Sequence, residues 1–366
     1  MRFAFTDQQT QFRDAVRQVL DKECTPGDLR SAFDAPAARG ARWTTLAEMG
    51  VAGLTVPEAQ GGLGLHLLDL VPLVEEAGRA GLPEPLIETT ALAAPLLAGF
   101  PSDPVAGWLE GIAAGRLTAA VAPVDLGGTT SGTTPGGPVV PAADGADLFI
   151  LTAAPATGDL DAVELHAVPA SAVTVTPVAS LDPTRRLGTV SWEPTTATRL
   201  ASGEHARAVL GDLAERAAVA TAAELLGLAD RMITMAAAYA KERNQFGKPI
   251  GSFQAVKHLL AGAQVKLEFA RPAVYAAAWS LGDAEMIGSP DSSRGASLAK
   301  AYASDAATEA ARVSLQVHGA IGYTWECDLH LFLKRAWALA EAWGSAADHR
   351  RRILSSLVDE VHRTPR

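Results

Sequence analysis

The strongest constraint on the fold is a set of long helical runs in the C-terminal half of the chain. Apolar residues recur at helical spacing over residues 204–241, 253–281, 293–318 and 328–361. Alanine is frequent in the first three runs, which favours helix formation and lets neighbouring helices approach closely. Pro272 lies inside the second run and should kink it or remove one hydrogen bond. The sequence therefore predicts a four-helix bundle over residues 204–366.

The residues before the bundle follow two other patterns. Residues 117–184 contain no Lys or Arg, and short Val, Ile, Leu and Thr runs alternate there with Gly, Pro and Asp clusters. Thr6 is a plausible N-cap for a helix, and apolar residues follow at helical spacing. We therefore expect an α+β fold: an N-terminal helical domain (1–117), a middle antiparallel β-barrel-like domain (118–203) and the C-terminal four-helix bundle.

Composition narrows the class of protein. With 366 residues and 48% hydrophobic content the chain can bury a large core, and a net charge of −10 argues against nucleic-acid binding. Cys24 and Cys327 are too few for a disulfide framework, which fits a reducing compartment. The N-terminus lacks the apolar segment of a signal peptide, and no apolar run reaches membrane-spanning length. We expect a cytoplasmic protein with no membrane partner and no metal site.

The first functional motif lies between the first two helical runs. Residues 242–250 read Glu-Arg-Asn-Gln-Phe-Gly-Lys-Pro-Ile, and Phe-Gln follows at 253–254. Arg243 carries a planar guanidinium suited to binding a diphosphate through two hydrogen bonds, and Phe246 adds an aromatic face. Gly247 permits a tight reversal of the chain. The alternative is that Arg243 only complements the C-terminal end of the helix dipole.

The second motif ends the third helical run. Residues 316–323 read Gln-Val-His-Gly-Ala-Ile-Gly-Tyr, with two glycines three positions apart. Such a break lets the backbone approach a ligand closely, although a plain helix C-cap is the alternative. We expect His318 to be a packing or capping residue rather than a proton shuttle.

Together the two motifs resemble the C-terminal signatures of the acyl-CoA dehydrogenase family, flavoenzymes that desaturate acyl-CoA thioesters. The resemblance implies FAD as cofactor and a dimer or tetramer, in which the residue matching Arg243 reaches the FAD diphosphate of a neighbouring subunit. Phe246 and Gln254 would line the same flavin. Gln316 would contact its adenosine portion, with Gly319 beside it. Residues 322–331 resemble heteromeric enzymes of bacterial steroid side-chain degradation, which implies a second subunit of the same family and a bulky, steroid-like acyl-CoA.

The pattern fails at the catalytic base. The reaction needs a carboxylate to take the α-proton of the thioester while the flavin takes the β-hydride. In many family members a Glu precedes a Gly-Thr/Ser pair, and here that position holds Trp343. In others the Glu lies on the first bundle helix, where this chain has Ala217. We therefore assign no catalytic residue. The β-domain loop that holds the flavin in the family is also poorly matched by residues 121–131.

Nearby acids do not replace the missing base easily. Glu215 and Glu341 each lie two residues before a base position, which rotates them about 200° around a helix. Glu224 shares the helix face of Ala217 but lies about 10 Å along the axis.

Three interpretations remain. The chain is a subunit that completes the FAD site of a catalytic partner, or a self-sufficient homo-oligomeric dehydrogenase with an unorthodox base. The third interpretation is a flavin-free scaffold of the same fold.

Overall fold

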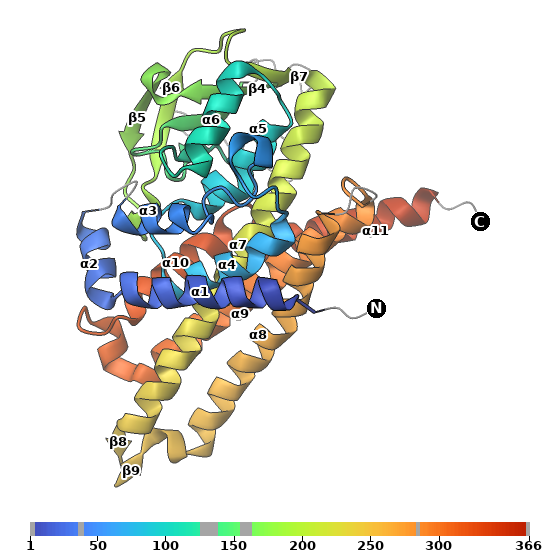
Figure 1. The fold of residues 1–366 in the computed structure, drawn as a ribbon. Coiled ribbons are helices and arrows are strands. Elements are labelled where there is room, and N and C mark those ends of the chain that lie inside the picture. The colour runs from blue at the N-terminus through green and yellow to red at the C-terminus, as the bar shows by residue number, and fades with distance from the viewer. Residues whose placement is uncertain (1–3, 36–39, 125–137, 154–162, 283–285, 364–366) are drawn as a thin grey trace.

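The chain folds into helical segments on either side of a middle region of β-sheets (Figure 1). The computed structural model describes residues 4–35, 40–124, 138–153, 163–282 and 286–363. The N-terminal helices are α1 (Asp7–Glu23), α2 (Pro26–Asp34), α3 (Ala41–Glu48), α4 (Leu67–Ala80), the π-helical segment η2 (Ile87–Ala93), α5 (Ala94–Ala98) and α6 (Asp103–Ala113). The expected N-cap at the start of α1 is confirmed: the amide of Gln9 donates to the hydroxyl of Thr6 at 3.2 Å.

The middle strands form two sheets, with the orders β1-β3-β4-β7 and β2-β6-β5. The strands are β1 (Ala119–Val121), β2 (Val139–Val140), β3 (Leu148–Ala153), β4 (Glu164–Pro169), β5 (Val173–Pro177), β6 (Gly188–Trp192) and β7 (Arg199–Ser202). One buried cluster contains Phe149 of the first sheet and Val140 and Val190 of the second, so the two sheets pack against each other.

The α+β fold class is confirmed, but the middle domain is not wholly antiparallel. β1 pairs with β3 in parallel, with Ala119 opposite Leu148. Parallel neighbours need a long connection, and more than twenty residues separate these two strands along the chain.

The bundle helices are α7 (Gly203–Glu242), α8 (Gln254–Ser280), α9 (Pro290–His318), α10 (Leu329–Glu341) and α11 (Ala346–Arg363). The sequence predicts a single helix over 328–361 as the fourth helix of the bundle. This prediction is wrong, because the helix is interrupted between α10 and α11. Trp343 and Gly344 have φ angles of 58° and 94°, and a right-handed helix cannot continue through such residues. The break coincides with one of the two base positions.

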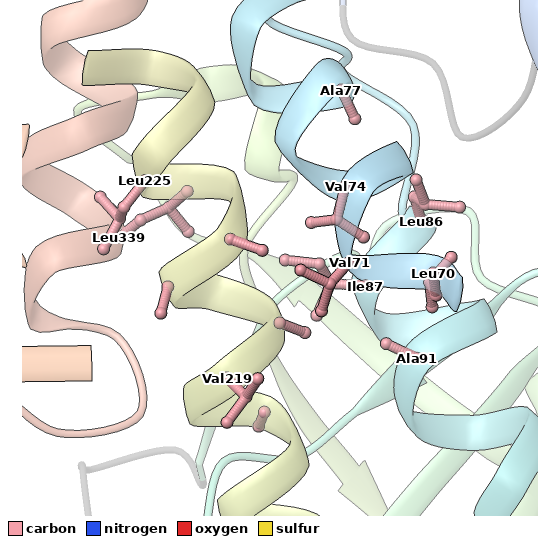
Figure 2. Close-up of a cluster of buried hydrophobic side chains, with 14 of the residues drawn as sticks. Leu70, Val71, Val74, Ala77, Leu86, Ile87, Ala91, Val219, Leu225 and Leu339 are labelled. Carbon is pink, nitrogen blue, oxygen red and sulfur yellow. The ribbon is translucent and has the colours of Figure 1, made fainter. Parts of the chain in front are cut away.

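The main core joins the N-terminal helices to the bundle. Figure 2 shows this layer, in which Val71 and Val74 of α4, Ile87 of η2 and Val219 of α7 belong to one buried cluster. None of the helices in the described ranges is long and apolar enough to cross a membrane. Within the same ranges, His, Cys, Asp and Glu side chains do not gather in groups of three or more that could hold a metal ion.

Glycines allow α4 and α7 to cross closely. A Cβ atom added at Gly227 of α7 would lie 1.8 Å from the carbonyl oxygen of Glu75. We expect Gly227→Ala to lower the free energy of unfolding by about 3 kcal/mol or more, because backbone must move to make room. Gly211→Ala is the matched control, since nothing lies within 4 Å of its Cβ and alanine should stabilise the helix by up to about 1 kcal/mol. Urea unfolding of both variants measures the difference; equal effects would contradict the close crossing.

Candidate functional site

The two sequence motifs lie at the same end of the bundle. The ring of Tyr239, in the last turn of α7, stacks on the ring of His318 at the end of α9, with 4.7 Å between ring centroids. His318 is buried, and its Nδ1 lies 2.7 Å from the carbonyl oxygen of Ser314, so its expected packing role is confirmed. The backbone amide of Arg243 donates to the carbonyl of Tyr239 at 2.9 Å. This ring pair therefore links the helix end that precedes Arg243 to the helix end that carries Gln316.

The first motif forms a hairpin that projects from the bundle. β8 (Asn244–Gln245) pairs with β9 (Lys248–Pro249), and Phe246 and Gly247 between them have φ angles of 53° and 79°. Positive φ at both central positions is typical of a type I′ turn. Phe246 is 92% exposed, and the side chain of Arg243 forms no hydrogen bond or ion pair with the residues that the structure describes. We call residues 243–254 the tip.

The tip lies far from the β-sheets of its own chain. α7 begins directly after β7 and contains 40 residues before Arg243, which corresponds to a length of about 60 Å. Figure 1 shows α7 running from the sheets at one end to the β8–β9 hairpin at the other. A ligand held by the β-sheets of this chain therefore lies out of reach of Arg243.

The remaining residues of the predicted set are also accessible. Gln254 is exposed at the start of α8, and Gln316 is exposed in the last turn of α9. Gly319 has a φ of 64°, and a Cβ atom added there would meet nothing within 4 Å. The set offers a free guanidinium, an aromatic face, two amides and an open backbone edge. These groups suit a ligand with a diphosphate and an aromatic ring, held against this surface from outside.

Both base positions are occupied by buried side chains that carry no carboxylate. Ala217 is 0% exposed on α7, and Trp343 is 7% exposed at the α10–α11 corner. The corner is fixed by hydrogen bonds, because Nε2 of His349 lies 3.0 Å from the Trp343 carbonyl and Lys300 Nζ donates to the Gly344 carbonyl at 3.0 Å. The tryptophan ring thus occupies a packed position at one base position, and alanine occupies the other. Neither position carries a carboxylate.

Lys300 is a buried cation that sequence reasoning did not identify. Its Nζ also donates to the Ala340 carbonyl at 2.9 Å and to Ser304 Oγ at 3.0 Å, which satisfies the end of α10. Burial lowers the pKa of Lys300 to about 7, although the carboxylate of Glu341 acts against that shift. Its position among alanines on a buried helix face was the sequence feature that could have pointed to it.

The low pKa of Lys300 predicts a pH dependence of stability. Between the folded pKa of about 7 and the ordinary lysine pKa of 10.5, the unfolded state binds more protons than the folded state. The free energy of unfolding should therefore rise with pH across this window. Lys300→Met should remove that rise, whereas the exposed control Lys257→Met should keep it. Urea titrations at pH 7, 8, 9 and 10 measure the slope, and the same slope in both variants would contradict the prediction.

A buried ion pair lies two helix turns from Ala217. Arg335 of α10 donates from Nε to Glu224 Oε1 of α7 at 2.5 Å and from Nη1 to Thr184 Oγ1 at 3.2 Å. The carboxylate of Asp182 lies 3.9 Å from Nη1. Burial raises the pKa of Glu224, and the adjacent guanidinium opposes that shift. The cavity beside the pair measures about 30 Å³, which is room for water but far below the usual size of a ligand site.

Of the other two acids near the base positions, Glu215 is placed as expected, whereas Glu341 does not face away from Trp343, because both line one surface cleft. Glu215 is buried on the opposite face of α7 from Ala217, where its Oε1 accepts from Arg352 Nη2 at 2.9 Å. Glu341 is exposed at the end of α10. The poorly matched flavin loop lies mostly at residues 125–131, outside the described residues.

Comparison with known proteins identifies the family. Residues 6–116 match the model of the acyl-CoA dehydrogenase N-terminal domain, and residues 208–358 match that of the C-terminal domain. The chain belongs to the acyl-CoA dehydrogenase family. It is 32% identical to acyl-CoA dehydrogenase IpdE2 of Mycolicibacterium smegmatis, over 95% of this chain and 98% of the relative. As a member of this family the chain is an oxidoreductase.

The chain is also similar to solved structures over its whole length. The chain matches the ChsE4-ChsE5 complex of Mycobacterium tuberculosis with 26% identity and a TM-score of 0.83, over 100% of both chains. It matches the steroid acyl-CoA dehydrogenase Tcur3481-Tcur3483 with 26% identity and a TM-score of 0.81, over 97% of this chain and 99% of the other.

Proposed function

We propose that this acyl-CoA dehydrogenase family member is a subunit that completes the FAD site of a catalytic partner in a heteromer. The complex would desaturate an acyl-CoA thioester between the α and β carbons, in the cytoplasm. The observation that carries this proposal is the place of the tip: about 60 Å of helix separates Arg243 from the sheets of its own chain.

Each residue of the set has a proposed task. Bound FAD would accept the β-hydride of the substrate. Arg243 would bind its diphosphate, and Phe246 and Gln254 would line the flavin. Gln316 would contact the adenosine portion beside the open backbone of Gly319. The free guanidinium of Arg243 and the open space at Gly319 fit these tasks.

The lack of a carboxylate at both base positions favours a heteromer over a homomer. Two alternative positions for one base must face the same carbon atom of the substrate, because a base acts within hydrogen-bond reach. In this chain Ala217 and Trp343 are packed into the core, and Glu224 is engaged by Arg335. The base would then come from another subunit. The similarity to the ChsE4-ChsE5 complex and to a steroid acyl-CoA dehydrogenase supports such a partner and a bulky, steroid-like acyl group.

Coexpression tests the proposal. The chain is purified alone and together with an acyl-CoA dehydrogenase encoded by a neighbouring gene, and mass and flavin absorbance are measured. We expect little flavin in the chain alone, and one FAD per pair of chains with acyl-CoA desaturation in the complex. Stoichiometric FAD and turnover in the chain alone would overturn the proposal.

Variants of two acids test the alternative that the chain is a self-sufficient dehydrogenase with a base of its own. Glu341 is its best remaining candidate, since this exposed carboxylate borders the same cleft as Trp343. If Glu341 or Glu224 is the base, Glu341→Gln or Glu224→Gln should abolish turnover while flavin stays bound. Unchanged turnover in both variants of the complex assigns the base to the partner.

A further inference from the structure

Two aromatic rings join the helix ends that carry the proposed FAD contacts. Tyr239 lies in the last turn of α7, and His318 is the last residue of α9. Their rings stack with 4.7 Å between the centroids and 21° between the ring planes. Aromatic pairs in such an arrangement attract each other beyond the apolar area that they bury. The contact therefore fixes the end of α7 relative to the end of α9.

His318 is held by two further contacts. Its Nδ1 lies 2.7 Å from the carbonyl oxygen of Ser314, one turn earlier on the same helix. The loop after α9 folds back over the histidine, because a Cβ atom added at Gly322 would lie 3.1 Å from the Cβ of His318 and 3.0 Å from Leu315 Cδ1. The two glycines of the second motif thus have different roles: Gly322 packs inward on His318, whereas Gly319 borders open space.

Arg243 is fixed to Tyr239 through the backbone. Its amide donates to the Tyr239 carbonyl at 2.9 Å, and its own carbonyl accepts from the amide of Ile250 at 2.8 Å. The returning part of the tip packs against the same turn of α7, since a Cβ atom added at Gly251 would lie 2.9 Å from the carbonyl oxygen of Ala240. A displacement of Tyr239 would therefore carry the Cα atom of Arg243 with it.

Gln316 is fixed to His318 by the geometry of α9. The two residues are two positions apart, so their side chains point about 200° apart around the helix axis. His318 is buried against Tyr239, and Gln316 is exposed on the other side of the helix. The buried ring thus sets the direction of the exposed amide.

We propose that Tyr239 and His318 are positioning residues, which hold Arg243 and Gln316 at the separation that one dinucleotide requires. This inference rests on the proposed function, in which the guanidinium binds the diphosphate of FAD and the amide contacts its adenosine portion. These two parts of FAD are joined covalently, so both contacts form fully only when the two helix ends are correctly spaced. Preorganised sites need a precision of about 0.5 Å, and a displacement of about 1 Å can cost about 100-fold. This role requires no contact between either ring and FAD.

Substitution of Tyr239 tests the positioning role in the complex with the partner. Tyr239→Leu removes the ring but keeps an apolar side chain, so FAD should bind about tenfold more weakly. Tyr239→Phe keeps the stacked ring and should bind FAD within about twofold of the wild type. Flavin fluorescence on dilution measures both dissociation constants, and urea unfolding shows that each variant is folded. Equal FAD affinity in the wild type and in Tyr239→Leu overturns the proposal, as does a Phe variant that binds as weakly as the Leu variant.

A double-mutant cycle separates positioning from independent binding. If the ring acts through Arg243, Tyr239→Leu should weaken FAD binding by less than about threefold when Arg243→Ala is already present, because the contact that it positions is lost. The cycle between Tyr239→Leu and Gln316→Ala should be non-additive for the same reason. Additive losses in both cycles would mean that Tyr239 acts independently of the two contacts, and overturn the proposal.

Met232→Ala is the matched control for a loss of packing alone. Met232 is fully buried on α7, about two turns before Tyr239. Its truncation should lower the free energy of unfolding at least as much as Tyr239→Leu does, because it leaves a cavity in the core. FAD affinity should nevertheless stay within about twofold of the wild type, since the two sites are far enough apart to act independently. An equal loss of FAD affinity in Met232→Ala and Tyr239→Leu would assign the effect to general loosening of the bundle and overturn the proposal.

The Arg243→Ala variant separates this inference from the proposed function. Weaker FAD binding in Arg243→Ala together with unchanged binding in Tyr239→Leu overturns the positioning role and leaves the proposed function standing. Unchanged FAD binding in both variants overturns the proposed function itself, and the positioning role with it.

Discussion

Replacing Arg335 by alanine is expected to lower the free energy of unfolding by about 3–5 kcal/mol. The substitution leaves the carboxylate of Glu224 buried without its counter-charge, and removing one partner of a buried pair is strongly destabilising. The hydroxyl of Thr184 loses a hydrogen bond at the same time. Urea unfolding with an unchanged m-value measures the loss.

The double variant Glu224→Leu with Arg335→Met is the control for this prediction. Both charges are replaced by apolar groups of similar size, so stability should stay within about 1 kcal/mol of the wild type or increase. In the complex with the partner, the double variant should keep its flavin and its turnover, because neither residue belongs to the proposed site. Loss of turnover in a stable double variant would contradict the structural role of the pair and restore Glu224 as a candidate base.

The helices of the bundle follow closely from the sequence, and their ends show where prediction fails. The run expected over 204–241 is the helix Gly203–Glu242, because alanine-rich apolar periodicity fixes a long helix well. The helix around Pro272 remains continuous in α8. The break at Trp343 was missed because the apolar pattern continues through it, and only Gly344 hints at a positive φ. The parallel pairing of β1 with β3 was missed because alternation within a strand does not identify its partner.

The candidate site was predictable only where its residues are contiguous. Arg243 and Phe246 stand in one motif, so their exposure at a helix corner could be expected from the turn chemistry of Gly247. The pair formed by Glu224 and Arg335 joins residues 111 positions apart, and no local pattern indicates which carboxylate meets which guanidinium.

Replacing Arg243 by alanine is expected to weaken FAD binding in the complex by about 100-fold, or about 2.7 kcal/mol. A guanidinium that binds a diphosphate makes two charge-assisted hydrogen bonds, each stronger than a neutral one. The stability of the chain itself should change by less than about 0.5 kcal/mol, because the side chain is exposed and forms no hydrogen bond or ion pair with a described residue. Flavin fluorescence on dilution of the complex measures the first effect, and urea unfolding the second.

Two further variants at the tip decide what Arg243 does. Arg243→Lys keeps the charge but loses the planar fork, so it should recover less than half of the lost binding free energy. Lys248→Ala removes a cation from the same hairpin, where its ammonium group lies 4.5 Å from the Phe253 ring, and should leave FAD binding nearly unchanged. Equal flavin retention in the wild type and in Arg243→Ala would mean that the tip serves packing alone, as in a flavin-free scaffold. A loss confined to the Arg243 variants would show that a guanidinium about 60 Å along α7 from its own sheets acts on a cofactor held by another subunit.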